Sequence, residues 1–561
     1  MRPRFRTRQD RSSRILEIPT ILIVLLGFAA ESGARPAALE LRPVSVELPA
    51  APSAILPADL DGDGHQDLVV ALAYTEWDQL GIEESAEMDG VEGLVEVLTI
   101  VPALTDRREV RFFRGDGHGD YEDAGTLALE RSVLSLFAGP PGMPIVALTD
   151  RGVAALRWRI SGELVLEAVI EDRPVIAGSG AFIPDLGLLH DLDGDGRGDL
   201  LFPADDGVAI YLAIPGGLAS RPAARRALPA DRRSRFGMVR HVPLPVLRDV
   251  DGDRLPDLLL PHHPLDWGRF HVLRNGGGGR LAAAAGPLVR GELGGDEVDG
   301  GEYQPDDDTE FVYFGDLDGD GVAEYVTQRQ LGDDDAGWRQ EMKEAKNPPF
   351  LYRFHKSRKD FTVEPEPYFE LEAVGYAFDT GDEDELRIPG GFQDLDGDGR
   401  LDLVALTLDF SILQAVRILT VKRISVGLDF HLWCQGDDGR LRPVRGLDLS
   451  GKFRLDLNNL RLGQLSQFAG DFDGDGRADF VQIGRGRKVT IHRGREGCFY
   501  PADPDATIEL AEAPRDLSLA RVEDLDGDGL TDLLVIQPQR RGEPGVSRPV
   551  RLDLYLSGDE E

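Results

Sequence analysis

Three features of the sequence predict an all-β fold made of repeated four-stranded antiparallel units. An acidic phrase of the form DxDGDGxxD, with small departures, occurs seven times between residues 59 and 532. Apolar runs of strand length precede and follow each phrase. The 561-residue chain also contains 66 glycines and 36 prolines, which favour turns and short elements over long helices. Four-stranded units of roughly 50 residues are typical of β-propeller blades.

The first 34 residues differ from the rest and have the pattern of a secretory signal peptide. Six arginines within residues 1–17 precede an apolar run at 18–30. This run has about 13 residues, fewer than the roughly 20 that a membrane-spanning helix needs, so an uncleaved anchor is the less favoured alternative. Ser32 and Ala34 offer a cleavage site. We expect a secreted chain (periplasmic, extracellular or at the cell surface) with no transmembrane span in its mature part.

The intervals between the acidic phrases imply eight repeats. The first interval spans 132 residues, whereas the others span 53 to 78. Residues 144–170 resemble a strand pair without the acidic phrase, so one repeat is predicted to have lost its loop. We therefore expect a propeller of eight blades, seven of them acidic, with a seven-bladed ring as the alternative.

Within each repeat the elements follow one order. A short apolar strand such as 311–314 enters the acidic loop, and an apolar run such as 68–72 leaves it. A third strand then leads through a glycine-rich turn, as in 270–284, into a weaker fourth strand. The expected blades cover residues 52–128, 129–175, 184–228, 243–290, 310–370, 390–447, 465–510 and 519–561.

The two ends of the repeat region are predicted to complete one blade. The repeat that starts near residue 519 contains three strands before Glu561, which would leave a sheet edge open to aggregation. Residues 39–48 form a strand-like segment with no partner before the first acidic phrase. We expect this segment to supply the missing outer strand and to close the ring.

The oxygen spacing in the acidic phrase predicts calcium. Side-chain oxygens stand at positions 1, 3, 5 and 9, glycine at position 6 permits a sharp turn, and position 7 can offer a backbone carbonyl. An EF-hand is excluded because no glutamate stands at position 12 and a β run follows. Magnesium is disfavoured because it takes few protein carboxylates and retains water. We expect up to seven structural Ca²⁺ ions as the only cofactor.

The predicted ligands are the same positions in every copy. The side-chain ligands are Asp59, Asp61, Asp63 and Asp67; Asp191, Asp193, Asp195 and Asp199; Asp249, Asp251, Asp253 and Asp257; Asp316, Asp318, Asp320 and Glu324; Asp394, Asp396, Asp398 and Asp402; Asp471, Asp473, Asp475 and Asp479; and Asp524, Asp526, Asp528 and Asp532. The backbone carbonyls are those of His65, Arg197, Val322, Arg400, Arg477 and Leu530. A solvated turn is the alternative for any single copy, and the third copy is the weakest because Arg254 replaces its turn glycine.

The phrases resemble the FG-GAP or VCBS repeats of integrin-alpha-like propellers. The likeness includes the aromatic and glycine lead-in of YFGDLDGDG (313–321) and FAGDFDGDG (468–476), and a downstream VLRNGGGG turn. It covers about residues 39–561 and is poorest at 130–175. The resemblance implies calcium in the loop between the first two strands of a blade, and adhesion or ligand recognition on a propeller face.

Charge and cysteine content restrict the partners. With 100 acidic and 62 basic residues the net charge is −38, which repels phosphates and excludes nucleic acid as a partner. Cys434 and Cys498 are the only cysteines and lie in consecutive repeats. In an oxidising compartment they can pair, but the sequence leaves the pairing open.

No catalytic signature accompanies the repeats. The sequence lacks a nucleophile elbow, an HExxH zinc motif and a phosphate-binding loop. We therefore expect a non-catalytic binding or adhesion module for a protein or glycan ligand. One alternative is a lyase-like enzyme, built on a calcium-binding propeller, that acts on polysaccharides. The other is a structural component of the cell envelope.

Overall fold

The computed structural model divides the chain into two units, Met1–Ala38 and Leu39–Glu561. The expected signal peptide lies outside the described residues. The structure describes residues 39–50, 52–75, 98–100, 105–139, 143–178, 180, 182–184, 186–227, 240–242, 245–263, 266–288, 297–298, 302–303, 309–331, 348–358, 363–364, 366–377, 391–409, 423–444, 449–456, 461–463, 467–483, 487–510, 520–538 and 549–558.

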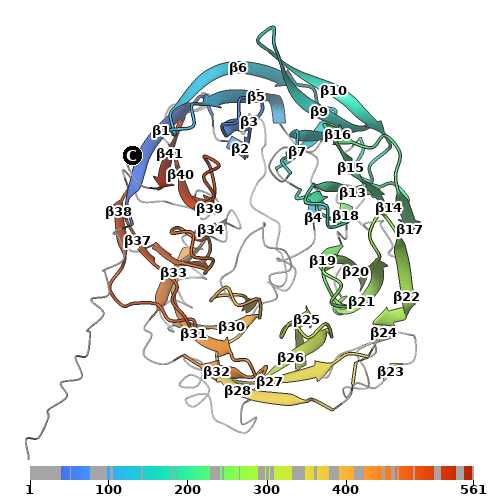
Figure 1. Cartoon of the computed structure of the whole chain (residues 1–561), viewed down its shortest axis with the longest axis vertical. Coiled ribbons are helices and arrows are strands. Elements are labelled where there is room, and N and C mark those ends of the chain that lie inside the picture. The colour runs from blue at the N-terminus through green and yellow to red at the C-terminus, as the bar shows by residue number, and fades with distance from the viewer. Residues whose placement is uncertain are drawn as a thin grey trace, which may run out of the picture. The chain divides into compact units, whose positions relative to one another are not determined.

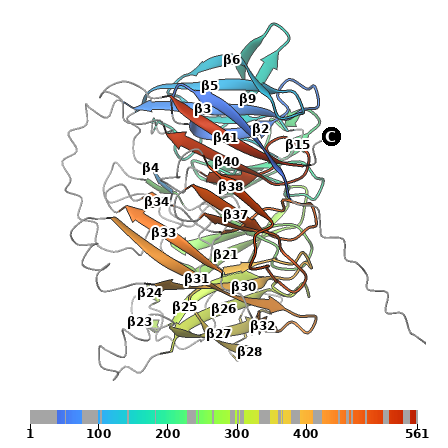
Figure 2. The same cartoon turned by 90° about the vertical axis from the view of Figure 1, so that its left-hand side faces the viewer.

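The unit from Leu39 onward is a β-propeller of eight antiparallel blades, as the sequence predicts (Figure 1). Every regular element among the described residues is a strand. Blades follow one another around the ring in chain order, and Figure 2 shows the same ring from the side. In the part of the chain that is described, no helix has the length and apolar character to cross a membrane.

Blades 1 to 4 take up the first half of the ring. Their strands are β2 (Pro52–Ala58), β3 (Asp67–Thr75), β5 (Thr105–Gly115) and β6 (Tyr121–Leu129) in blade 1; β7 (Val133–Phe137), β8 (Val146–Thr149), β9 (Gly152–Arg159) and β10 (Glu163–Glu171), with β11 (Ile183–Pro184) parallel to β7, in blade 2; β12 (Leu189–His190), β13 (Asp199–Ala204), β14 (Gly207–Tyr211) and β17 (Ala224–Ala227) in blade 3; and β19 (Val246–Arg248), β20 (Asp257–His263), β21 (Asp266–Asn275) and β22 (Leu281–Leu288) in blade 4.

Blades 5 to 8 take up the second half of the ring. Their strands are β25 (Thr309–Gly315), β26 (Glu324–Gln330), β27 (Pro349–Lys356) and β28 (Phe369–Val374) in blade 5; β29 (Gly391–Gln393), β30 (Asp402–Asp409), β31 (Arg423–Gln435) and β33 (Ser450–Asp456), extended by β34 (Arg461–Gly463) and β32 (Leu441–Pro443), in blade 6; β35 (Gln467–Phe468), β36 (Phe480–Ile483), β37 (Lys488–His492) and β38 (Ala506–Glu509) in blade 7; and β39 (Ala520–Glu523), β40 (Asp532–Pro538), β41 (Val550–Ser557) and β1 (Leu41–Leu48) in blade 8.

Three short ribbons lie outside the blade sheets. They are β15 (Ala213–Ile214) with β16 (Gly217–Leu218), β4 (Leu98–Ile100) with β18 (Arg240–Val242), and β23 (Glu297–Val298) with β24 (Glu302–Tyr303).

Blade 2 is the blade without an acidic loop, because the segment that joins β7 to β8 contains no acid. We expected two strands at 144–170, but the structure has three in this stretch, β8 to β10. Turns at 150–151 and 160–162 separate them.

The N-terminal strand closes the ring, as predicted. β1 pairs antiparallel with β41 from Leu41 opposite Ser557 to Leu48 opposite Val550. Its inward side chains Val46 and Leu48 are buried in the core between blades 8 and 1. The first and last strands of the propeller are thereby joined in one sheet.

The hydrophobic core lies between neighbouring blades. Strand β3 shows the pattern: Leu68 and Val70 pack toward blade 8, whereas Val69 and Ala71 pack toward blade 2. Both faces of each inner strand are therefore buried, which explains why these strands read as continuous apolar runs without alternation. This packing fixes the start of each second strand. It therefore also fixes the position of the acidic loop that precedes that strand.

Candidate metal centres

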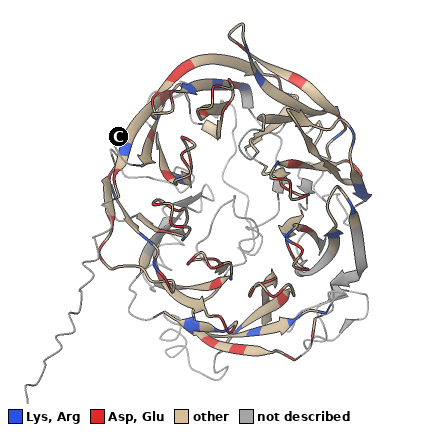
Figure 3. Cartoon of the chain, in the orientation of Figure 1, with Lys and Arg blue, Asp and Glu red and all other residues tan. Residues whose placement is uncertain are grey.

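Each acidic phrase forms the loop between the first and second strands of its blade. In Figure 3 red segments recur at these inner loops around the ring. The loops belong to blade 1 and blades 3 to 8, as the spacing of the phrases predicts. The same local structure is therefore available seven times for comparison.

The first acid of each loop organises the turn. Oδ1 of Asp59 accepts hydrogen bonds from the backbone N–H groups of Gly62 (2.7 Å) and Asp63 (3.1 Å), and its Oδ2 accepts one from Gly64 (3.0 Å). In all seven loops the backbone N–H of position 6 donates to the first acid. The glycines at positions 4 and 6 have positive φ, as Gly62 (79°) and Gly64 (93°) show.

The ninth acid joins the loop to the third strand of the blade. Asp67 is fully buried; its Oδ2 accepts the backbone N–H of Leu60 (2.9 Å) and its Oδ1 that of Gly115 at the end of β5 (2.9 Å). Asp402 does the same with Leu395 (3.0 Å) and Gln435 (2.7 Å). A buried carboxylate at this position holds two strands and a loop in one arrangement.

Burial raises the pKa of the ninth acids, although backbone hydrogen bonds lower it in part. The pKa rises to about 6 for Asp67 and Asp199. It rises to about 7 for Asp257, Glu324, Asp402, Asp479 and Asp532. A nearby positive charge would favour the ionised form of these carboxyls at neutral pH.

The third acid leaves a buried oxygen without a hydrogen bond in four loops. Among the described residues, these atoms are Oδ1 of Asp193, Asp251, Asp396 and Asp473. A buried carboxylate oxygen without a partner is costly, and a bound cation would satisfy it. The donor set is all oxygen, which suits a hard cation such as Ca²⁺.

The structure brings together the first, third and ninth acids in three loops, and the first, third and fifth acids (Asp316, Asp318 and Asp320) in the blade 5 loop. In the first three loops the grouped acids are Asp59, Asp61 and Asp67; Asp191, Asp193 and Asp199; and Asp249, Asp251 and Asp257, each with carboxylate oxygens within 4.8 Å of one another. The fifth acids are exposed and accept the backbone N–H of position 7, as Asp63 does from His65 (2.9 Å). The predicted carbonyl ligands at position 7 are thus placed at the loop exit.

Basic side chains approach four loops from the third strand, and we did not predict them. They form the ion pairs Arg114–Asp61, Arg274–Asp251, Lys356–Asp318 and Arg493–Asp473, each with the third acid. Lys356 lies opposite the ninth acid Glu324, and continuing the register of the other three blades by one residue places each arginine opposite its ninth acid. The only signal in the sequence is a basic residue just before or within the turn after the third strand, as in FFRG and VLRNG.

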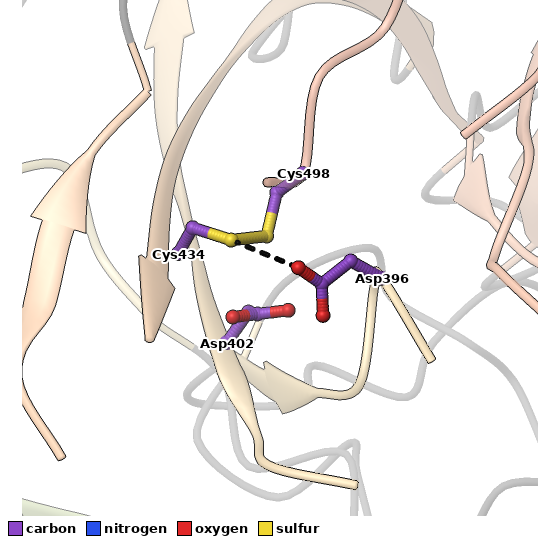
Figure 4. A group of neighbouring side chains, drawn as sticks. All are labelled: Asp396, Asp402, Cys434 and Cys498. Carbon is purple, nitrogen blue, oxygen red and sulfur yellow. Dashed lines mark hydrogen bonds between the residues drawn. A yellow bond between two sulfur atoms is a disulfide. The ribbon is translucent and has the colours of Figure 1, made fainter. Parts of the chain in front are cut away.

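A disulfide occupies that register position in blade 6. Cys434, at the end of β31, bonds to Cys498 of blade 7, so the pairing that the sequence left open is present. Figure 4 shows Asp396 and Asp402 directed toward the two sulfur atoms, with Sγ of Cys434 3.5 Å from Oδ2 of Asp396. The backbone N–H of Gly497 donates to the same oxygen (3.3 Å). Blade 7 thereby contributes to the acidic loop of blade 6.

The FG-GAP-like repeat family matches residues 471–535, which hold the acidic loops of blades 7 and 8. This match agrees with the repeat identified in the sequence. No curated protein matches the chain. Among solved structures, the PQQ-bound aldose sugar dehydrogenase of Streptomyces coelicolor aligns over 56% of this chain and 94% of its own, with 12% identity and a TM-score of 0.21. At that TM-score the likeness carries no argument.

Proposed function

We propose that the chain is a secreted calcium-binding propeller that acts as a non-catalytic binding or adhesion module for a protein or glycan. The observation that supports calcium most strongly is the set of buried third-position oxygens without a partner, each beside a buried ninth acid. The propeller and its FG-GAP-like repeat fit a binding module. The secretory pattern of residues 1–34 supports export.

In this proposal the ions act as parts of the fold. Each loop holds four acids, and most of their oxygens already accept backbone N–H groups, so the loop is shaped before an ion arrives. A divalent cation would offset the repulsion among these acids and stabilise the connection between first and second strands. Ligand recognition would then use surfaces that the ion-stiffened ring holds in place.

Calorimetric titration of the metal-stripped full chain tests the calcium proposal. We expect saturable binding of Ca²⁺, with proton release near neutral pH because buried carboxyls must ionise. Mg²⁺ at the same concentration should compete weakly. Equal affinity for the two ions, or no binding of Ca²⁺, would contradict the proposal.

A glycan and protein array, read with calcium and with chelator, tests the binding module. We expect selective ligand capture that is lost in chelator. Incubation of the captured glycans with the chain, followed by analysis for unsaturated products, serves as the enzymatic control. Product formation would favour the lyase-like alternative, and a blank array would favour a structural component of the envelope.

A further inference from the structure

Lys356 places its ammonium group among the acids of the blade 5 loop. It ends β27 directly opposite Glu324 in the antiparallel register. Its Nζ lies 3.1 Å from Oδ2 of Asp318 and 2.8 Å from Oδ2 of Asp320, and it also contacts Oε1 of Glu324. One side chain thus contacts the acids at positions 3, 5 and 9, around the point where a cation would bind.

The arginines at the same register position behave differently. Arg114 and Arg274 each pair with Oδ2 of the third acid of their loop, at 2.6 Å and 3.1 Å. The second oxygen of the ninth acid in their loops accepts a backbone N–H group. The guanidinium groups of Arg114 and Arg274 thus contact the third acid of their loops, whereas the ammonium of Lys356 contacts the acids at positions 3, 5 and 9.

The ninth position of the blade 5 loop changes together with the lysine. Six loops have aspartate there, and this loop has Glu324. Oε2 of Glu324 still accepts the backbone N–H of Leu317 (2.7 Å), as in the other loops. Its additional methylene lets Oε1 meet the ammonium of Lys356, where the other loops use a backbone N–H.

We infer that Lys356 is a built-in cation that replaces calcium in the Asp316–Glu324 loop, so that six of the seven loops take an ion. The inference rests on the calcium binding proposed above. A Ca²⁺ ion in this loop would have to displace an ammonium that is three-quarters buried and holds three carboxylates. The ammonium of Lys356 therefore offsets part of the negative charge of the blade 5 loop at any calcium concentration.

Counting bound calcium in the full chain after equilibrium dialysis tests the inference. We expect six ions in the wild-type chain, seven in Lys356→Met, and six in Lys488→Met, which removes an exposed lysine of β37 as a matched control. No bound calcium in any of the three would reject the proposed function and this inference with it. Seven ions in the wild type, or no gain in Lys356→Met while the wild type binds calcium, would overturn the inference alone.

Terbium luminescence gives a second test that does not depend on the folding of the Lys356 variant. Nζ of Lys356 lies 5.2 Å from the ring centroid of Tyr368, so terbium bound in this loop would receive energy from that tyrosine. In the wild-type chain, we expect Tyr368→Phe to leave tyrosine-sensitised emission unchanged. A marked loss of emission would place an ion in the loop and overturn the inference.

Discussion

At position 6 of the third loop, Arg254 adopts the backbone conformation that glycine adopts in the other six loops. Its φ is 69°, and its backbone N–H donates to Asp249 (2.8 Å) as the glycines do in their loops. The left-handed region is unfavourable for a residue with a Cβ atom. Arg254 is therefore a locally strained residue in an otherwise regular loop.

Replacing Arg254 with glycine should stabilise the chain. We expect a gain of about 1 kcal/mol in unfolding free energy, because glycine carries no penalty at positive φ. The reverse change, Gly196→Ala, should destabilise by a similar amount, since its φ is 80° and no atom lies within 4 Å of the added Cβ. Denaturant unfolding measures both, and a loss of stability in Arg254→Gly would show that the arginine side chain matters more than its backbone.

The ninth acids determine the pH dependence of the ion-free chain. Their pKa values of about 6 to 7 in the folded state lie above the ordinary value of 3.8, so between these values the folded chain binds more protons than the unfolded chain. Stability without calcium should therefore rise as the pH falls from 8 to 5. With calcium bound, these carboxylates are held ionised, so stability should fall over the same range.

Thermal unfolding at a series of pH values, with calcium-free buffer and with saturating calcium, measures this change of sign. The same slope in both series would contradict calcium binding at the ninth acids.

At the level of strands and loops, the disulfide links β31 of blade 6 to blade 7. Its two cysteines are 64 residues apart in the sequence. Removing the disulfide therefore raises the conformational entropy of the unfolded chain. The double variant Cys434→Ser, Cys498→Ser should lose roughly 2–4 kcal/mol of unfolding free energy. Chemical denaturation of the oxidised, the reduced and the variant chain measures the effect. Equal stability of all three would show that packing alone holds the two blades together.

Regular spacing made the repeats, the seven acidic loops and the eight blades predictable. The acids recur at fixed positions, and the doubled first interval marks the blade without a loop. The basic partners Arg114, Lys356 and Arg493 were not predictable in the same way. Their role depends on the register between second and third strands, and the connections between these strands differ in length from blade to blade.

For the molecule as a whole, closure depends on β1. Leu48 is 1% exposed and packs in the core that blades 8 and 1 share. Leu48→Ala should cost about 3 kcal/mol of unfolding free energy, a usual cost for a buried leucine. Glu47→Ala, its exposed neighbour on the same strand, is the matched control and should change stability little. Equal effects of the two substitutions would show that β1 does not hold the ring closed.

Calcium is expected to stabilise the ring at many points at once. Each occupied loop adds stability in proportion to the logarithm of ion concentration over its dissociation constant, so six loops act together. The direct measurement is thermal unfolding of the full chain in calcium, in chelator, and in chelator followed by excess magnesium. We predict that the midpoint in calcium exceeds that in chelator by more than about 10 °C, and that magnesium restores little of the difference. Equal midpoints in calcium and chelator would show that the acidic loops are turns without ions and would contradict the proposal.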